Sequence, residues 1–202
     1  MIRKKRWFPS VYMFIVTAFF STIVIGFTKF TRQRVETNQR LAFEKAVLSV
    51  LPNVSVDQVN IHNQYETLIN EPTKDTAGAY VYHADAGNLV YILPLSGQGF
   101  WAPIKGVIGI KSDKQTITGI AFYEQNETPG LGAEITEEPF KKQFAGKILA
   151  RNGKYLNVKR PGDELGQSEV HAVTGATQTS VRLEKIINTS IENWRKQLNK
   201  QS

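Results

Sequence analysis

Near its C-terminal end the chain reads Val173-Thr174-Gly175-Ala176-Thr177-Gln178-Thr179-Ser180, and a long segment with helical periodicity follows directly. Hydroxyl side chains and a glycine just before a helix can present backbone N–H groups and a side-chain oxygen to a phosphate. The same residue types also form an ordinary turn that leads into a helix N-cap. Taken alone, this stretch leaves both interpretations open.

A second distinctive string, Glu127-Thr128-Pro129-Gly130-Leu131-Gly132, ends a strand-like segment upstream. Pro129 fixes its own φ, while Gly130 and Gly132 allow the main chain to approach a planar ring closely. The alternative is a simple Pro-Gly turn that caps the strand. This string therefore also leaves a structural and a binding interpretation open.

Read in this order, the two strings resemble the FMN-binding domain of respiratory flavoproteins. These are the C subunit of the sodium-translocating NADH:quinone reductase (Nqr) and the G subunit of the related Rnf complex. Segments 97–101, 117–124 and 140–144 resemble the same family, the Nqr branch in particular, and the resemblance extends over residues 10–195.

The resemblance implies that FMN is attached covalently, as a phosphoester on Thr177. It implies further cofactor-binding residues in both strings and one aromatic residue: Thr174, Gly175, Ala176, Thr179, Ser180, Glu127, Thr128, Pro129, Gly130, Leu131, Gly132 and Trp101. Trp101 is expected either against the flavin or in the core. The family usually has an acidic residue six positions before the modified threonine, where this chain has His171. No catalytic residue and no metal ligand is expected.

The sequence predicts different roles for the hydroxyl groups near Gly175. Thr179 and Ser180 are expected at the N-cap and in the first turn, where helix amides use their hydroxyls. Thr174 is expected to point away from the turn, which leaves Thr177 with a free hydroxyl beside the helix. A threonine hydroxyl without an adjacent base is a poor nucleophile. The family's magnesium-dependent flavin transferase is therefore an expected transient partner.

Composition narrows the possible chemistry of the chain. The 202 residues include no cysteine, so disulfides, thiolate metal sites and iron–sulfur clusters are excluded, and any redox role requires a bound organic cofactor. The three histidines show no metal-site spacing. The net charge is +7. Its basic residues concentrate around the N-terminal apolar segment and the last helix, which indicates lipid headgroups and partner surfaces rather than nucleic acid.

The N-terminal region predicts a membrane anchor. Residues 10–28 carry no charged side chain, and as a helix they would extend roughly 29 Å, about the thickness of a bilayer's hydrocarbon core. A cleaved signal peptide is the alternative, but no small-x-small site follows. Basic residues lie on both sides of the segment, with a narrow excess before it, which favours a cytoplasmic N-terminus: Arg3, Lys4, Lys5 and Arg6 before; Lys29, Arg32 and Arg34 after.

The expected organisation has four parts: a basic cytoplasmic N-terminus (1–9), a transmembrane anchor (10–29), a connecting helix (30–52) and an FMN-binding domain (53–202). The fold class is α+β, with a mixed sheet and packed helices. Periodicity predicts helices over 33–51, 136–150 and from 179 or 180 to 198, and strands over 79–83, 89–93, 107–110, 116–123 and 155–158, with a hairpin at 112–115. Residues 54–76 are expected to form a loop with a short element.

The resemblance, together with the apolar N-terminal segment, implies a membrane-anchored electron carrier with covalent FMN, a redox subunit of a sodium-translocating NADH:quinone oxidoreductase. The other membrane subunits would be its partners, and its FMN domain would lie on the periplasmic side of the inner membrane. Three alternatives stay open: the G subunit of an Rnf-type ferredoxin:NAD oxidoreductase, a stand-alone extracytoplasmic flavoprotein reductase, and a non-redox lipid- or protein-binding module.

Overall fold

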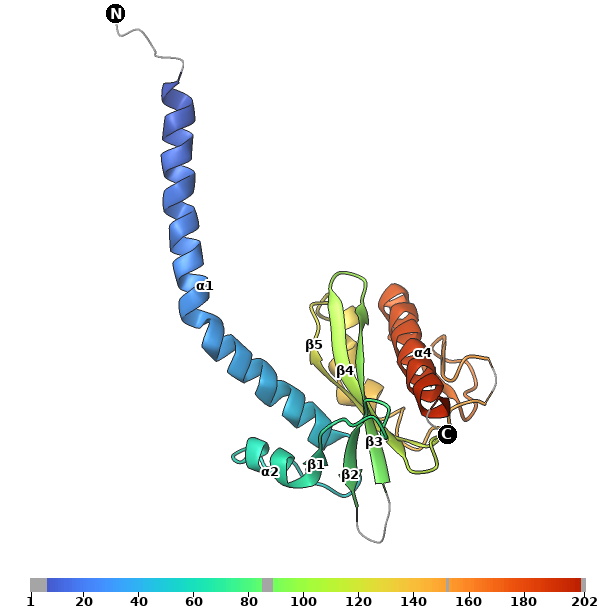
Figure 1. The fold of residues 1–202 in the computed structure, drawn as a ribbon. Helices are drawn as coiled ribbons and strands as arrows, with labels where there is room; N and C mark the ends of the chain where they lie inside the picture. Colours follow the sequence, from blue (N-terminus) through green and yellow to red (C-terminus); the bar gives the residue numbers. More distant parts are fainter. Residues whose placement is uncertain (1–6, 85–88, 152, 201–202) are drawn as a thin grey trace, which may run out of the picture. The chain divides into compact units, whose positions relative to one another are not determined.

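The computed structural model describes residues 7–84, 89–151 and 153–200 (Figure 1). Most of the basic N-terminus expected in the cytoplasm, residues 1–6, lies outside the described residues. The chain divides into two units, residues 1–40 and residues 41–202. The folded unit therefore begins within the segment that the sequence predicts as a connecting helix.

A single long helix, α1 (Phe8–Ser49), contains the predicted anchor and most of the predicted connecting helix, and it ends three residues earlier than the predicted residue 52. It includes an 18-residue window with a mean hydropathy of 2.0, none of which is buried, and it is long and apolar enough to cross a membrane. A signal sequence would meet the same criterion. The helix ends at Ser49, shortly before Pro52, which cannot continue a helical hydrogen-bond ladder.

The centre of the folded unit is an antiparallel sheet with the order β1-β2-β3-β4-β5 over the described residues. Its strands are β1 (Ile69–Asn70), β2 (Tyr80–His83), β3 (Leu89–Gln98), β4 (Pro103–Lys111) and β5 (Ile117–Glu124). The four strands predicted between 79 and 123 are confirmed. The predicted hairpin at 112–115 is confirmed as well: Asp113 Oδ1 accepts the N–H groups of Gln115 and Thr116, both at 2.8 Å.

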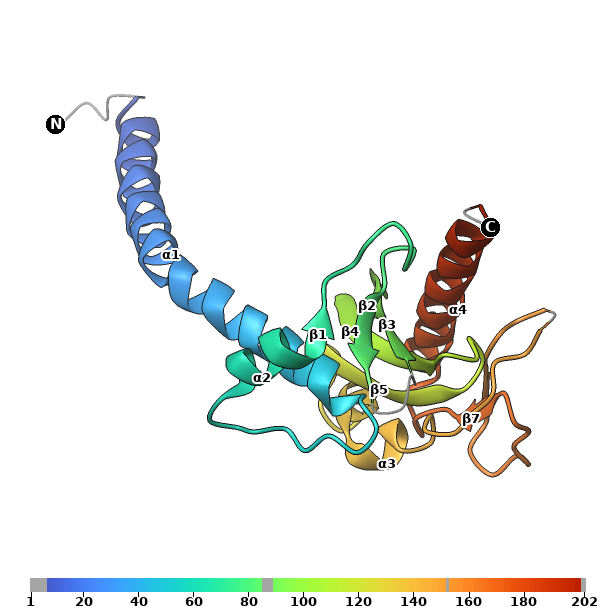
Figure 2. The ribbon, with the colours of Figure 1, turned by 60° about the horizontal axis from the view of Figure 1, so that its bottom comes forward.

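Both faces of this sheet are covered. On one face, Val90, Ile92 and Val107 pack against Tyr65 of α2 (Ile61–Leu68) and against the buried side chains at the end of α1 and just after it: Ala46, Val47, Leu48, Val50 and Leu51. On the other face, Leu95, Ile104 and Ile108 pack against α4 (Thr177–Asn199). Figure 2 shows α2 and α4 on opposite sides of the sheet. The predicted α+β domain with packed helices is thus confirmed, although its main sheet is antiparallel.

The helix predicted over 136–150 is wrong. The structure has a 3-10 helix, η2 (Gly132–Thr136), and one short helix, α3 (Glu138–Lys141). Gly146 adopts a φ of 80°, and Lys147 and Leu149 then form backbone hydrogen bonds with Ile117 and Gln115 at 2.8 and 2.9 Å. Backbone groups that form hydrogen bonds with the start of β5 cannot also form helical hydrogen bonds. The apolar Phe140 and Phe144 therefore reach the core from the short helix α3 and from the turn that follows it.

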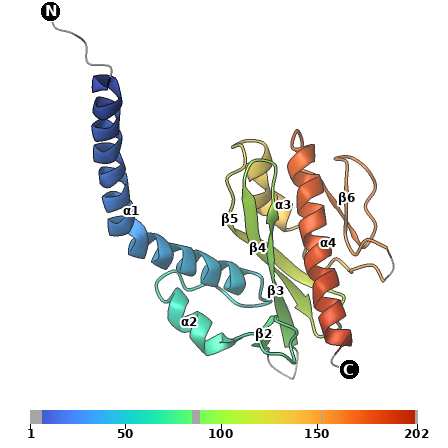
Figure 3. The same ribbon diagram turned by 45° about the horizontal axis from the view of Figure 1, so that its top comes forward.

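A short parallel pair, β6 (Asn157–Lys159) and β7 (Glu169–His171), completes the described elements. The strand predicted at 155–158 is confirmed in part, since β6 includes residues 157 and 158 and extends to Lys159, whereas β7 was not predicted. Figure 3 shows α4 between the main sheet and β6. This arrangement places the N-terminal end of α4, which contains Thr177 and Thr179, beside the loop that follows β5.

Candidate functional site

A pocket of about 310 Å³ lies where three loops meet the start of α4. Its lining comes from the segment after β3, from the loop after β5 and from the turn before α4: Phe100, Trp101, Glu127, Thr128, Leu131, Gly132, Gly175, Ala176, Thr177, Gln178 and Thr179. The structure thus brings the two distinctive strings and Trp101 into one site. Four of the predicted residues do not line the pocket: Pro129, Gly130 and Thr174, which lie in the same turns, and Ser180 in the first turn of α4.

The loop after β5 is built as a tight turn. The N–H of Leu131 donates to the carbonyl of Thr128 at 3.1 Å, with Pro129 and Gly130 at the centre of the turn. Gly130 has a φ of 73°, the conformation that a type II turn with proline at its second position requires at its third. The turn leaves Leu131 43% exposed, and its side chain lines the pocket.

The turn before α4 has the same construction and touches the first. The N–H of Ala176 donates to the carbonyl of Val173 at 3.1 Å, and Gly175 between them has a φ of 77°. A Cβ on Gly175 would lie only 3.0 Å from Leu131 Cδ2. A side chain at position 175 is therefore disfavoured twice, by the backbone conformation and by the neighbouring turn.

The helix α4 begins at Thr177, with Ala176 as its N-cap and no side-chain hydrogen bond to the cap. The prediction that Thr179 and Ser180 use their hydroxyls on helix amides is therefore wrong. Thr179 donates to Glu127 Oε2 at 2.7 Å, and Ser180 Oγ accepts the N–H of Val173 at 3.1 Å. The first-turn amides of α4 are left without a side-chain cap beside the pocket, where they favour an anion.

A buried carboxylate joins the loops around the pocket. Glu127 is 5% exposed, and its Oε1 accepts the N–H of Trp101 at 3.1 Å while its Oε2 accepts the hydroxyl of Thr179. Space around it is kept by glycines, because a Cβ at Gly132 would lie 2.6 Å from Thr179 Oγ1 and 2.9 Å from Glu127 Oε2. A Cβ at Gly99 would also collide with Glu127 Oε1.

Two aromatic side chains stand at the rim of the pocket. Trp101 is 66% exposed and Phe100 is 44% exposed, and their rings meet edge to face with centroids 5.0 Å apart. Trp101 lies outside both core clusters, so its position does not fit the core alternative. Phe100 and Gln178 were not predicted as site residues, although Phe100 lies in the segment 97–101 that resembles the family and Gln178 lies in the string 173–180.

The pocket has the features that a flavin mononucleotide requires. Trp101, Phe100 and Leu131 offer apolar surface for a planar ring, and the uncapped start of α4 suits a phosphate. The exposed hydroxyl of Thr177 lies at that same helix end. The volume lies at the lower end of the roughly 300–1,000 Å³ of typical ligand pockets.

The histidines lie away from this pocket. His62 Nδ1 is 3.0 Å from Glu44 Oε1, and His171 Nε2 is 2.8 Å from the carbonyl of Asp163. The N–H of His171 donates to Gln143. No group of three His, Cys, Asp or Glu side chains that could hold a metal ion is found among the described residues.

Part of the chain matches a known family of domains. Residues 99–192 match the family model of the FMN-binding domain. This range includes every residue that lines the pocket. The resemblance predicted from the sequence is therefore confirmed.

The similar proteins carry a more specific name. Over 121 residues the chain is 35% identical to the C subunit of the Na(+)-translocating NADH-quinone reductase of Pasteurella multocida (strain Pm70), an alignment that covers 58% of this chain and 45% of the relative. The corresponding C subunit of Chlamydia pneumoniae is 45% identical over 77 residues, 38% of this chain and 24% of the relative. The matched part is thus less than half the length of each of these curated relatives.

Solved structures extend the similarity beyond the matched domain. The crystal structure of the reductase's C subunit from Parabacteroides distasonis superposes with a TM-score of 0.69 and 28% identity, covering 82% of this chain and 96% of that one. NqrC of Shewanella oneidensis, at 24% identity and a TM-score of 0.51, shares the fold; the match covers 79% of this chain and 81% of that one.

Proposed function

We propose that this chain is a membrane-anchored, FMN-carrying electron-transfer subunit of a sodium-translocating NADH:quinone oxidoreductase. One observation carries the proposal: the two strings that resemble the family meet in one pocket, at the uncapped start of α4. The match to the FMN-binding domain and the names of the similar proteins support it. FMN, when bound, supplies the capacity to accept and pass on electrons, which this cysteine-free chain lacks.

We assign the covalent link to Thr177. Thr179 is 3% exposed and bonded to Glu127, and Ser180 is 1% exposed and bonded to Val173. Thr174 is exposed but does not line the pocket. Thr177 is the exposed threonine of the α4 start that lines it, so a phosphoester there would lie beside the first-turn amides.

The chain's own residues would bind and orient the group. Trp101 and Leu131 would contact the flat ring, and the start of α4 would stabilise the phosphate by about 0.3–1 kcal/mol at an exposed position. The carboxylate of the lining, Glu127, bonds Trp101 and Thr179 rather than Thr177, so it is not an adjacent general base for the Thr177 hydroxyl. Attachment is therefore assigned to a separate flavin transferase.

A direct test of the link compares threonine variants made in a host that contains the transferase. Wild-type protein should keep flavin fluorescence through a denaturing gel and gain the mass of FMN less water. Thr177→Ala should lose both, while Thr174→Ala and Thr179→Ala should retain most of the fluorescence. A fluorescent Thr177→Ala band, or a peptide map that places the flavin on another residue, would overturn the assignment.

We further propose that α1 is retained as the anchor, with the domain on the periplasmic side. Its apolar window supports this, and the narrow excess of positive charge before the window favours a cytoplasmic N-terminus. Protease added to intact spheroplasts should cut the domain and spare cytoplasmic markers. Protection of the domain would reverse the orientation, and a mature chain that starts after Thr28 would identify a signal peptide.

Isolation of the complex in mild detergent separates the alternatives. The proposed function predicts co-purification with further subunits of an Nqr-type complex. A ferredoxin-like partner with several clusters would indicate the Rnf branch instead. A flavin-containing protein that runs alone would indicate a stand-alone reductase, and a colourless one a non-redox module.

A further inference from the structure

Glu127 has an unusual electrostatic position in this domain. It is the charged member of the pocket lining, and no ion pair with it is found in the part of the chain that the structure describes. Two other glutamates on neighbouring elements are paired with lysines: Glu124 with Lys105 at 2.9 Å and Glu184 with Lys154 at 2.6 Å. Glu127 is also less exposed than Glu184.

The hydrogen bonds of Glu127 do not by themselves need a charge. A glutamine could accept the N–H of Trp101 through Oε1 and donate to the hydroxyl of Thr179 through Nε2, because a hydroxyl both donates and accepts. Burying an ionised carboxylate without a cation is costly even when it is hydrogen-bonded. The charge therefore calls for a role beyond joining the loops.

We propose that Glu127 is a positioning residue that holds Trp101 and Thr179 around the pocket and, through its fixed negative charge, lowers the midpoint potential of the bound FMN. The inference rests on the proposed function. A negative charge in a pocket wall opposes the arrival of an electron, and this repulsion is stronger in a protein interior than in water. The amide of Trp101 and the hydroxyl of Thr179 keep the charge in place.

The test uses the full chain, loaded with FMN in a host that contains the transferase and purified in detergent, and measures the midpoint potential by spectroelectrochemistry. Glu127→Gln keeps shape and hydrogen-bonding capacity but removes the charge, so the potential should become more positive. The matched control is Glu184→Gln, which removes a buried carboxylate that does not line the pocket and should leave the potential unchanged.

Thr179→Val provides an independent test, because it should shift the midpoint potential in the opposite direction. It removes the hydroxyl that donates to Glu127 Oε2 but keeps the carboxylate, so the negative charge is less well screened and the potential should become more negative. This variant also tests the inference if Glu127→Gln does not fold. Glu127→Ala should release the N–H of Trp101 and change the visible circular dichroism of the flavin.

The outcomes distinguish the two proposals. Wild-type protein without flavin would contradict the proposed function. If the wild type carries flavin but Glu127→Gln and Thr179→Val have the same midpoint potential as the wild type, only the inference is contradicted. An equal shift in Glu184→Gln would also overturn it, because the effect would then come from buried charge in general.

Discussion

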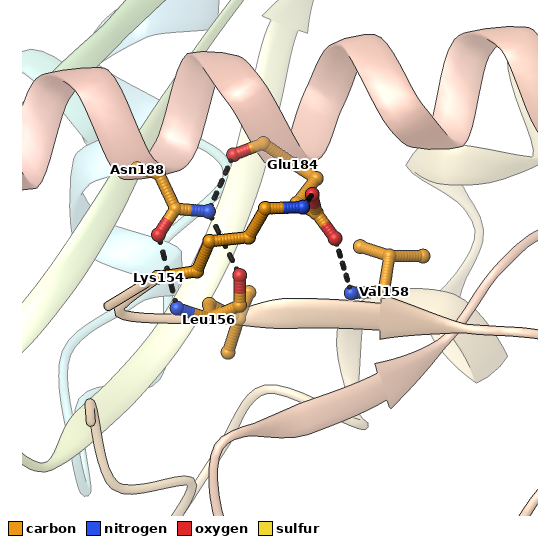
Figure 4. Close-up of polar contacts among 5 residues, drawn as sticks. All are labelled: Lys154, Leu156, Val158, Glu184 and Asn188. Carbon is orange, nitrogen blue, oxygen red and sulfur yellow. Dashed lines mark hydrogen bonds and ion pairs between the residues drawn. The ribbon is translucent and has the colours of Figure 1, made fainter. Parts of the chain in front are cut away.

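Glu127 and Glu184 both form hydrogen bonds that connect α4 to other segments of the chain, but their surroundings differ. Glu184 lies on α4, where Oε2 accepts the N–H of Val158 at 2.7 Å and Oε1 pairs with Lys154 (Figure 4). Glu127 lies in the loop after β5 and reaches the start of α4 through Thr179. One carboxylate has a lysine and faces β6, whereas the other has two neutral donors and faces the pocket.

The difference separates a structural contact from a functional one. Around Glu184, Asn188 adds hydrogen bonds to both backbone groups of Leu156, so this region is satisfied entirely by the protein (Figure 4). Around the pocket, the helix amides of α4 and the aromatic rim are left for a ligand. Changes at the first region should act on folding, and changes at the second on the flavin.

The largest effect on stability is expected from Asn188→Ala. The change leaves the N–H and the carbonyl of the buried Leu156 without their partners, and each unsatisfied buried group costs about 1–3 kcal/mol. Chemical denaturation should show the loss, with flavin content per folded molecule unchanged. The exposed Asn193→Ala on the same helix is the control and should change stability by no more than about 0.5 kcal/mol.

Gly132→Ala should act on the pocket instead. Its new Cβ would lie 2.6 Å from Thr179 Oγ1 and 2.9 Å from Glu127 Oε2, and such overpacking costs about 1–3 kcal/mol. We expect lower covalent flavin content, measured by absorbance per protein. Gly166→Ala meets only the end of the Glu169 side chain, at 3.3 Å, and should keep full flavin content. Equal flavin content in the two variants would contradict this role of Gly132.

A double-mutant cycle sharpens the comparison. Glu127→Ala and Thr179→Val remove two ends of one hydrogen bond, so their effects on unfolding should be coupled by about 0.5–3 kcal/mol. Glu184→Ala shares no hydrogen-bond partner with Thr179→Val. That pair should add to within about 0.5 kcal/mol. Coupling of the same size in both cycles would contradict the proposed difference between Glu127 and Glu184.

The smallest effect is expected from Lys154→Ala. The lysine side chain is 63% exposed, and an exposed ion pair contributes only about 0.2–1 kcal/mol. The loss should shrink as salt is added, while the hydrogen bond from Val158 to Glu184 remains. A loss that does not respond to salt would show that Lys154 acts through packing instead.

The sequence predicted those turns and strands that depend on residues close together in the chain. The Pro129-Gly130 turn, the Gly175 turn and strands β2 to β5 follow from residue type and alternation, whereas β1 lies in the stretch expected as a loop with a short element. The helix expected over 136–150 failed because its residues pair with the start of β5, a contact between segments distant in the sequence. An apolar stripe at helical spacing cannot reveal such a partner.

The same limit applies to the candidate site. Both turns were predicted as cofactor-binding, and the structure brings them together. The helix-capping role expected of Thr179 and Ser180 was wrong, because Thr179 bonds instead to Glu127, 52 positions away. A glutamate at the start of a turn gives no local sign that it will be buried and will join two other loops.

The continuity of α1 has a practical consequence for protein production. Val47, Leu48 and Val50 are at most 1% exposed and form part of the core on one face of the sheet. A fragment cut at the predicted domain boundary, residue 53, would lack these side chains and leave part of that face of the sheet uncovered. Fragments intended for crystallisation or spectroscopy should therefore begin no later than Leu41.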